Sequence, residues 1–297
     1  MIFNPQKYDD IYIYIGKQIK SSYPLYVIYN IIFLALHNVM IDIQMLELNR
    51  YNVFDFIIQG SHTLTMHYTE AIVGSLWFVP MFLIAKSLFA VSFKSAEKCK
   101  FKLIGHIIVI LIYGILGVFT NHYDMFLVNN MQTALIGIPV IYMGYIFNQY
   151  KDKAIKYATP ISCVVSVVLM FLLLYSDIGS IELSANQIIS PILFYPVTML
   201  GILFCVSFAQ IIQKSSIFTK VFSHLGSISF HIMALHFVVF KCFDWIYGLA
   251  SGVDRTNMMC FPTALDNIGL IYCTLGIGVP VLLVGTVRKL PYIYKKG

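Results

Sequence analysis

Long apolar segments alternate with short polar connections along this chain, and the pattern predicts a helical membrane protein. A helix needs about 20 consecutive apolar residues to cross a bilayer. Eight segments approach or exceed that length: 23–41, 71–93, 101–119, 131–149, 159–176, 190–212, 225–247 and 268–288. We therefore predict an all-α polytopic bundle with about eight transmembrane helices.

Composition excludes the two main alternatives to a membrane protein. Apolar residue types make up 59% of the 297 residues and charged residues 11%, against about 45–50% and about 25% in soluble domains. The mean hydropathy is +0.78. So few charges cannot cover a water-facing surface, which excludes a single soluble domain. Disordered chains are low in hydrophobicity and rich in charge, so the composition excludes disorder as well.

None of the connections is long enough to form a separate soluble domain. We predict one membrane-embedded domain over 1–297, with an interfacial cytoplasmic segment at 1–22 and the helical bundle at 23–288. The longest loop, 42–70, contains an apolar stretch from Tyr51 to Gln59 that we expect on the membrane surface.

The distribution of basic residues between the loops indicates how the chain is oriented in the membrane. Sixteen of the 20 Lys and Arg residues lie in the N-terminal segment, the C-terminus and every second loop. The alternate loops contain only Arg50 and Arg255. Because cytoplasmic loops collect Lys and Arg, both termini are predicted to be cytoplasmic, in a multi-pass protein of the cell membrane. The net charge of +6 is thereby explained, and we expect membrane lipid, not nucleic acid, as a partner.

Ser229 and His236 are the most informative polar residues within an apolar segment. Their spacing of seven residues places them on one helix face. Polar groups inside a span are costly and tend to face a bundle interior or a wet cavity. His titrates near neutral pH and moves protons, so His236 is a candidate catalytic group. A buried His bonded to a neighbouring helix is the structural alternative.

Other polar residues allow both a structural and a functional interpretation. Lys86, in the cytoplasmic half of the second span, either extends to the interface or meets an anionic cofactor in a cavity. Pro80 should bend the second span. Trp77, which precedes it, either belongs to an aromatic belt at the membrane interface or lines a cavity. Lys241 and Asp244 are spaced for an intrahelical pair. Cysteine and histidine spacings predict no metal site.

Several stretches of the sequence resemble membrane-bound acyltransferase family 3, the O-acetyltransferases of bacterial polysaccharides. Leu76-Trp77-Phe78-Val79-Pro80 is similar to a "LWFLP" run of that family, and Met143-Gly144-Tyr145 to its "LGY" span. Leu225-Gly226-Ser227-Ile228-Ser229, followed by Leu235-His236, resembles a third motif, and 17–24 a fourth. In order and spacing these motifs cover roughly residues 5–290, nearly the whole chain.

The resemblance implies transfer of an acetyl or other acyl group from cytoplasmic acyl-CoA to a hydroxyl of a cell-surface or secreted polysaccharide, without a metal. Lys86 would then meet CoA, and His236, Ser229 and Trp77 would line the cavity. The first two spans of the family, with the Arg and His of the first, have no counterpart in this sequence. His37 lies in a span, but Val27 stands where an Arg would accompany it, so the catalytic role is not transferred to His37. We expect an N-terminally truncated member with weak or no activity, and we leave its catalytic residues unassigned.

Two other classes of function remain open at this stage. One is a transporter or flippase for a lipid-linked saccharide, which Gly and Pro interruptions at matching places in two halves would favour. Pro80, Pro139 and Pro280 interrupt spans without convincing two-half symmetry. The other is a non-catalytic membrane partner within a glycan assembly complex. The sequence names neither the acceptor glycan nor the oligomeric state.

Overall fold

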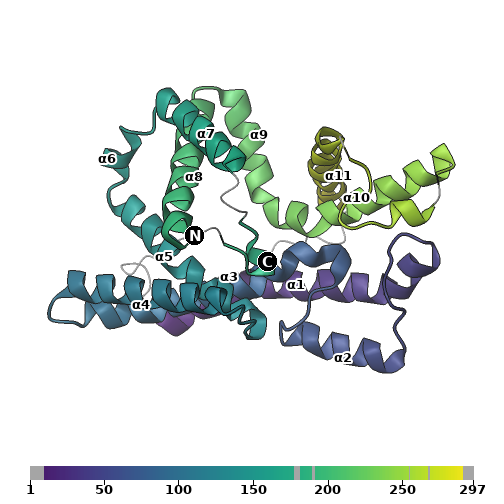
Figure 1. The fold of residues 1–297 in the computed structure, drawn as a ribbon, viewed down its shortest axis with the longest axis horizontal. Coiled ribbons are helices and arrows are strands. Elements are labelled where there is room, and N and C mark those ends of the chain that lie inside the picture. Colours follow the sequence, from purple (N-terminus) through teal and green to yellow (C-terminus); the bar gives the residue numbers. More distant parts are fainter. Residues whose placement is uncertain (1–9, 177–180, 189–190, 254, 267, 290–297) are drawn as a thin grey trace. The chain divides into compact units, whose positions relative to one another are not determined.

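A computed structural model describes residues 10–176, 181–188, 191–253, 255–266 and 268–289, and this part of the chain is helical (Figure 1). Within these ranges, seven helices are long and apolar enough to cross a membrane, and an eighth apolar helix, α7, is shorter. The described residues show no strand beyond one isolated bridge between Glu182 and Gln187. These findings confirm the prediction of an all-α polytopic membrane protein.

The helix boundaries follow the apolar segments closely. The α-helices are α1 (Ile11–Asp42), α2 (Val53–Leu64), α3 (Phe78–Glu97), α4 (Lys102–His122), α5 (Met131–Gln149), α6 (Lys151–Ile155), α7 (Pro160–Tyr175), α8 (Pro191–Ile212), α9 (Ser216–Ser227), α10 (Ser229–Ser251) and α11 (Gly269–Lys289). Four 3-10 segments connect them: η1 (Ala71–Trp77), η2 (Val128–Asn130), η3 (Leu183–Ala185) and η4 (Arg255–Met258).

The helix α1 continues without a break from Ile11 to Asp42, so the described part of the segment predicted to be interfacial belongs to the same helix as the first span. Residues 1–9 of that segment lie outside the described part of the chain. Two boundaries correct the sequence-based expectations. The segment 225–247 is two helices, α9 and α10, which meet at the non-helical Ile228. In the second span the helix type changes between Trp77 and Phe78, so Pro80 lies in the first turn of α3, where a proline is tolerated.

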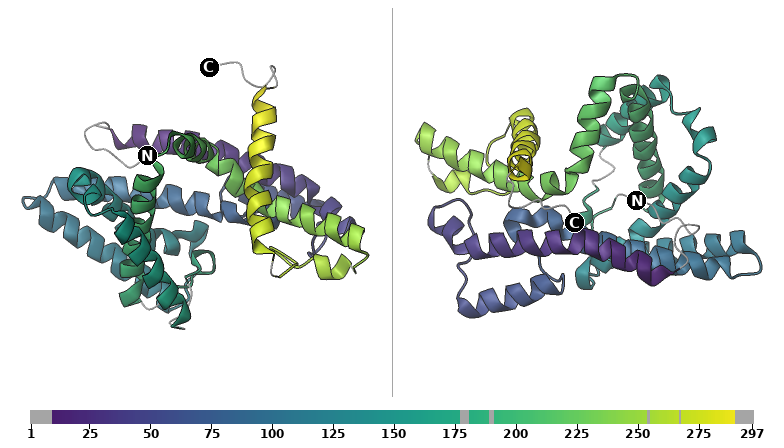
Figure 2. Two further views of the ribbon diagram at one scale, coloured as in Figure 1. Left: turned by 90° about the horizontal axis from the view of Figure 1, so that it is seen from above. Right: turned by 180° about the vertical axis from the view of Figure 1, so that it is seen from behind.

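The chain divides into two compact units. The first contains residues up to Ser22 and Phe78–Lys220, and the second contains Tyr23–Trp77 and the residues from Val221 onward. In the first unit α4 packs on α3 and α5, and α7 packs on α8. In the second unit α10 packs on η1, η4 and α11; Figure 2 shows α11 crossing α10.

Close helix packing in the first unit depends on a glycine of α4. A Cβ atom at Gly117 would lie 2.7 Å from the Cγ1 of Ile136 and 2.8 Å from its backbone nitrogen, in α5. No real Cβ atom tolerates such distances to backbone, so α4 and α5 would have to separate. Small residues at membrane helix contacts let the backbones approach in this way.

We expect Gly117→Ala to lower the free energy of unfolding by about 1–3 kcal/mol, the range for overpacked cores. The matched control is Gly201→Ala in α8, where a Cβ meets nothing within 4 Å. That change should be neutral or stabilise by up to about 1 kcal/mol, because alanine favours the helix. Thermal unfolding of both variants in detergent measures the difference, and equal midpoints would contradict the packing argument.

Candidate functional site

An open groove in the second unit contains two of the predicted site residues. It has a volume of about 660 Å³ and is lined by residues of α9, α10 and α11. Its lining is mostly apolar, with Ser229 and His236 among its few polar side chains. The size falls within the usual 300–1,000 Å³ range of small-molecule pockets. Two polar groups in an otherwise apolar groove make this the leading candidate site.

Hydrogen bonds fix the tautomer of His236. Its Nδ1 lies 2.8 Å from the carbonyl oxygen of Met233 and 3.2 Å from that of Ile232. A carbonyl oxygen can only accept, so Nδ1 carries the hydrogen. The neutral ring then has an unprotonated Nε2, which has no hydrogen-bond partner among the described residues. An imidazole held in this way has the form required of a general base.

The carbonyl of Met233 accepts a second hydrogen bond. The hydroxyl of Ser75, in η1, donates to the same oxygen. A carbonyl oxygen has two lone pairs, so Ser75 and His236 occupy both acceptor positions. This bond joins η1 to the turn of α10 that orients the imidazole ring.

Ser229 occupies a different environment from the one the sequence suggested. It is the first residue of α10, is exposed, and donates from its Oγ to the carbonyl of Gly226 over 3.0 Å. It lines the same groove as His236, but the described contacts include no hydrogen bond between the two side chains. Trp77 is half-buried at the end of η1 and is absent from the lining of this groove in the described structure.

Lys86 lies in α3, in the first unit. Its Nζ donates to the Oε1 of Gln18 over 2.9 Å and lies 4.0 Å from the ring centroid of Phe82. The side chain is half-buried. An ammonium group has three donors, so contact with Gln18 leaves Lys86 able to donate to an anion as well.

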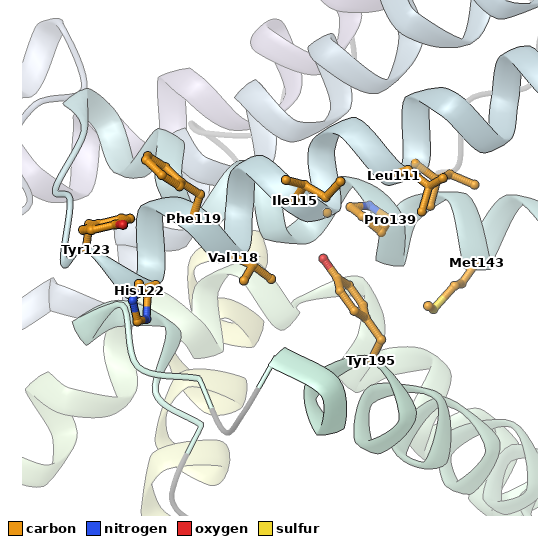
Figure 3. Close-up of a pocket in the computed structure, with 11 residues that line it drawn as sticks. Leu111, Ile115, Val118, Phe119, His122, Tyr123, Pro139, Met143 and Tyr195 are labelled. Carbon is orange, nitrogen blue, oxygen red and sulfur yellow. The ribbon is translucent and has the colours of Figure 1, made fainter.

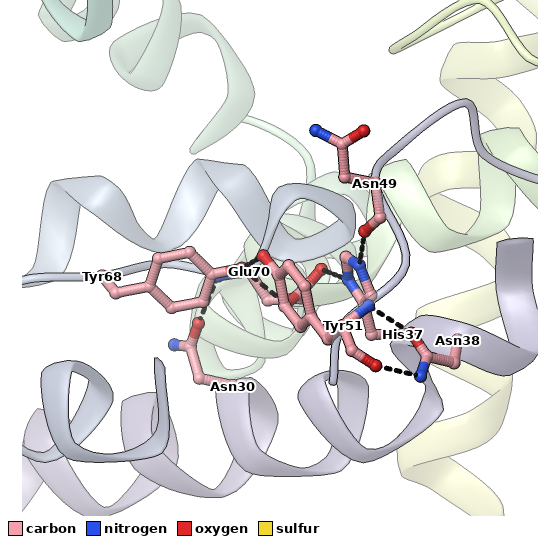
Figure 4. Close-up of polar contacts among 7 residues, drawn as sticks. All are labelled: Asn30, His37, Asn38, Asn49, Tyr51, Tyr68 and Glu70. Carbon is pink, nitrogen blue, oxygen red and sulfur yellow. Dashed lines mark hydrogen bonds and ion pairs between the residues drawn. The ribbon is translucent and has the colours of Figure 1, made fainter. Parts of the chain in front are cut away.

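A buried polar network in the second unit escaped the sequence analysis (Figure 4). His37 of α1 and Glu70 are 1% and 0% exposed, and Nδ1 lies 2.8 Å from Oε1. The ring of Tyr51 stacks on the imidazole with centroids 3.6 Å apart. Tyr68 donates to Oε2 of Glu70 over 2.7 Å, which makes Tyr51 the donor in its 2.9 Å bond to Tyr68.

This network engages both nitrogens of His37. The Nε2 lies 3.0 Å from the carbonyl oxygen of Asn49 and must donate to it, while one proton lies between Nδ1 and Glu70. Neither nitrogen is left to take a proton from a substrate. His37 therefore has a structural environment, whereas His236 has the environment of a base. Ionisable residues in apolar surroundings were the signal in the sequence, but their pairing across 33 positions required the fold.

A second cavity lies in the first unit, among α4, α5 and α8 (Figure 3), and has a volume of about 640 Å³. The side chains around it are mostly apolar, and His122, Tyr123 and Tyr195 are the polar types among them. No sequence-predicted site residue lines it. The groove that contains His236 consequently remains the better candidate for chemistry.

Comparison with known proteins identifies the family. The profile of the family described as "Acyltransferase domain", acyltransferase family 3, matches residues 2–284. The chain therefore belongs to this family and is an acyltransferase-type membrane protein with multiple spans. No curated protein and no solved structure gave a significant match.

Proposed function

We propose that this protein transfers an acetyl or other acyl group from acyl-CoA to a hydroxyl of a cell-surface or secreted polysaccharide. Family membership supports acyl transfer, and the observation that carries the catalytic role is the tautomer of His236. Its Nδ1–H is held by backbone carbonyls in a groove, and Nε2 is left as an acceptor. We infer that this nitrogen is the general base.

In the proposed reaction, the acceptor hydroxyl gives its proton to Nε2 of His236 as its oxygen attacks the thioester carbonyl. The new C–O bond forms, the C–S bond breaks, and the proton passes to the departing thiolate of CoA. General-base catalysis of this kind contributes about 10²–10⁴-fold to rate. Ser229 lines the same groove. Its hydroxyl hydrogen is donated to Gly226, and its oxygen can accept a hydrogen bond from a hydroxyl of the acceptor saccharide.

An acyl-transfer assay on membranes that contain the protein tests this proposal. Acetyl-CoA labelled in the acetyl group is supplied with a polysaccharide that has free hydroxyls. We expect label in the polysaccharide as an alkali-labile ester. Acetyl-CoA should also protect the purified protein against heat, by about 2.7 kcal/mol at a hundredfold excess over Kd. An unlabelled polysaccharide together with no protection would contradict the proposal and favour a transporter or a non-catalytic partner.

Lys86 is proposed to bind the phosphates of acyl-CoA. We expect Lys86→Gln to raise the KM for acetyl-CoA about tenfold, the equivalent of one charge-assisted contact of roughly 1.4 kcal/mol, and to change kcat little. Steady-state kinetics at varied acetyl-CoA separates the two constants. Lys98→Gln, at an exposed position just after α3, is the matched control. If both variants keep the natural KM, Lys86 has no part in donor binding.

A further inference from the structure

The segment 43–70 runs back along α1 instead of projecting from its end. Near the start of the segment, the side chain of Asn38 exchanges two 2.8 Å hydrogen bonds with the backbone of Tyr51. Beyond it, the hydroxyl of Tyr23 donates to the carbonyl of Leu64 over 2.7 Å. These contacts tie both ends of α2 to α1, and the two helices lie side by side with opposite chain directions (Figures 1 and 2).

The length of α2 matches the length of α1 that it follows. Asn38 and Tyr23 are separated by about 22 Å along a continuous helix with a rise of 1.5 Å per residue. The 12 residues of α2 extend about 18 Å. The helix therefore covers most of the distance between its two points of attachment.

Charged residues mark the part of α1 that crosses the bilayer. Lys20 and Asp42 bracket a stretch without Lys, Arg, Asp or Glu. They are separated by about 33 Å of helix, close to the roughly 30 Å thickness of the hydrocarbon layer. Tyr23 and Asn38 both lie inside this stretch. A helix attached at both positions lies at membrane depth.

The exposed face of α2 is apolar except near its C-terminal end, where Ser61 and His62 are exposed as well and the hydroxyl of Ser61 donates to the carbonyl of Ile58. Val53, Phe54, Ile57 and Leu64 are 77%, 67%, 64% and 55% exposed. The charge of Asp55 lies in the first turn, where it accepts a bond from the backbone of Asn52 in a capping box. The bracketed stretch of α1 has exposed apolar residues of the same kind, including Ile28, Ile32 and Val39. Exposed apolar side chains are thus present both on α2 and on the stretch of α1 that it follows.

Side chains of α1 replace water as partners for the irregular backbone of segment 43–70. Five side chains of α1 form hydrogen bonds with backbone groups at the end of α2 or outside it: Tyr23, Tyr26, Asn30, His37 and Asn38. Their partners are backbone groups of Asn49, Tyr51, Leu64, Tyr68 and Glu70. Irregular backbone persists at membrane depth only where protein satisfies its polar groups. A loop exposed to water would need no such side-chain partners, because water would hydrate its backbone.

We propose that segment 43–70 is a re-entrant hairpin and that Val53, Phe54, Ile57 and Leu64 of α2 contact the hydrocarbon chains of the bilayer. The five polar side chains of α1 lie on the inner side of this hairpin and form hydrogen bonds with its backbone. The predicted position of 51–59 on the membrane surface is the competing outcome. The proposal does not depend on the activity of the protein.

Tryptophan quenching in reconstituted bilayers distinguishes the two positions. Trp77 and Trp245 are replaced with Phe, and a single Trp is introduced by Ile57→Trp. The control is Leu48→Trp, at an exposed apolar position in the irregular segment before α2. We expect lipids brominated in mid-chain to quench Trp at 57 at least threefold more than at 48. Aqueous iodide should give the opposite order.

If iodide quenches the Trp at position 57 as strongly as the Trp at position 48, the proposal is overturned and α2 lies on the membrane surface.

A second pair of variants needs no change to the natural tryptophans. Ile57→Lys is expected to reduce the folded, monodisperse protein recovered from membranes several-fold, because a lysine would enter hydrocarbon. Leu48→Lys should leave recovery unchanged. Equal recovery of these two variants would also overturn the proposal.

Discussion

Replacing His236 with glutamine is expected to lower kcat for acyl transfer by about 10²–10⁴-fold, the contribution of a positioned general base. Glutamine retains a hydrogen-bonding side chain of comparable length but has no nitrogen that takes a proton. The KM for acetyl-CoA should change little, since the proposed role of His236 concerns the acceptor hydroxyl. Single-turnover transfer of labelled acetyl groups measures the effect.

The matched control is His224→Gln, at an exposed position of α9 that is absent from the groove lining. This variant should transfer at the rate of the natural protein. Should His236→Gln retain full activity while folding normally, the base lies elsewhere. Ser75→Ala adds a separate test of positioning: it removes one bond to Met233, so its loss should be smaller, and Ser75→Thr should restore most of it.

Lys241→Met is expected to cost about 3–5 kcal/mol of unfolding free energy, the usual penalty for leaving a buried charge without its partner. Both Lys241 and Asp244 are 0% exposed, and Nζ lies 3.1 Å from Oδ2. The same Nζ donates to the carbonyls of Met258 and Cys260. All three ammonium hydrogens are thereby used, and the end of η4 and the residues just after it are held against α10.

A double variant separates the charge from the packing. With Asp244→Asn added to Lys241→Met, the unpaired charge disappears. The amide oxygen can still accept from the backbone of Ala264, as Oδ2 of the carboxylate does, and the amide NH2 then faces the hydroxyl of Tyr272, which donates to Oδ1 in the natural protein. We expect the double variant to recover roughly half of the lost free energy. Unfolding in mixed micelles of detergent and SDS measures the free energy of unfolding of the single and the double variant. A single variant within about 0.5 kcal/mol of the natural protein would show that the pair is energetically neutral.

The long apolar segments predicted most of the fold because a bilayer-spanning helix requires a length that few other elements share. Predicted and observed boundaries of α5, 131–149 and Met131–Gln149, coincide. The break at Ile228 was not predicted, since an isoleucine inside an apolar segment gives no local signal for leaving the helical conformation. Pro80 gave a signal for a bend, but the change of helix type came before it.

The candidate site was predictable only in part. The shared helix face of Ser229 and His236 follows from their spacing, and the structure places both in one groove. The tautomer of His236 depends on carbonyls of its own helix and on Ser75 of η1, which no spacing rule joins to α10. Likewise, the partners of His37 come from a segment that folds back along α1. Contacts between residues far apart in the sequence depend on the tertiary structure, so they cannot be predicted from residue types and local spacing.

The doubly occupied carbonyl of Met233 has a mechanical consequence. Ser75 reaches it from η1, the element that follows Glu70 directly in the chain, and Glu70 is bonded to His37 and Asn30. A displacement of the proposed hairpin that moves η1 would pull Ser75 from the oxygen. The imidazole of His236 would then be held by the carbonyls of α10 without the support of η1. The hydroxyl of Ser75 is therefore the link between the folded-back segment and the turn that orients the proposed base.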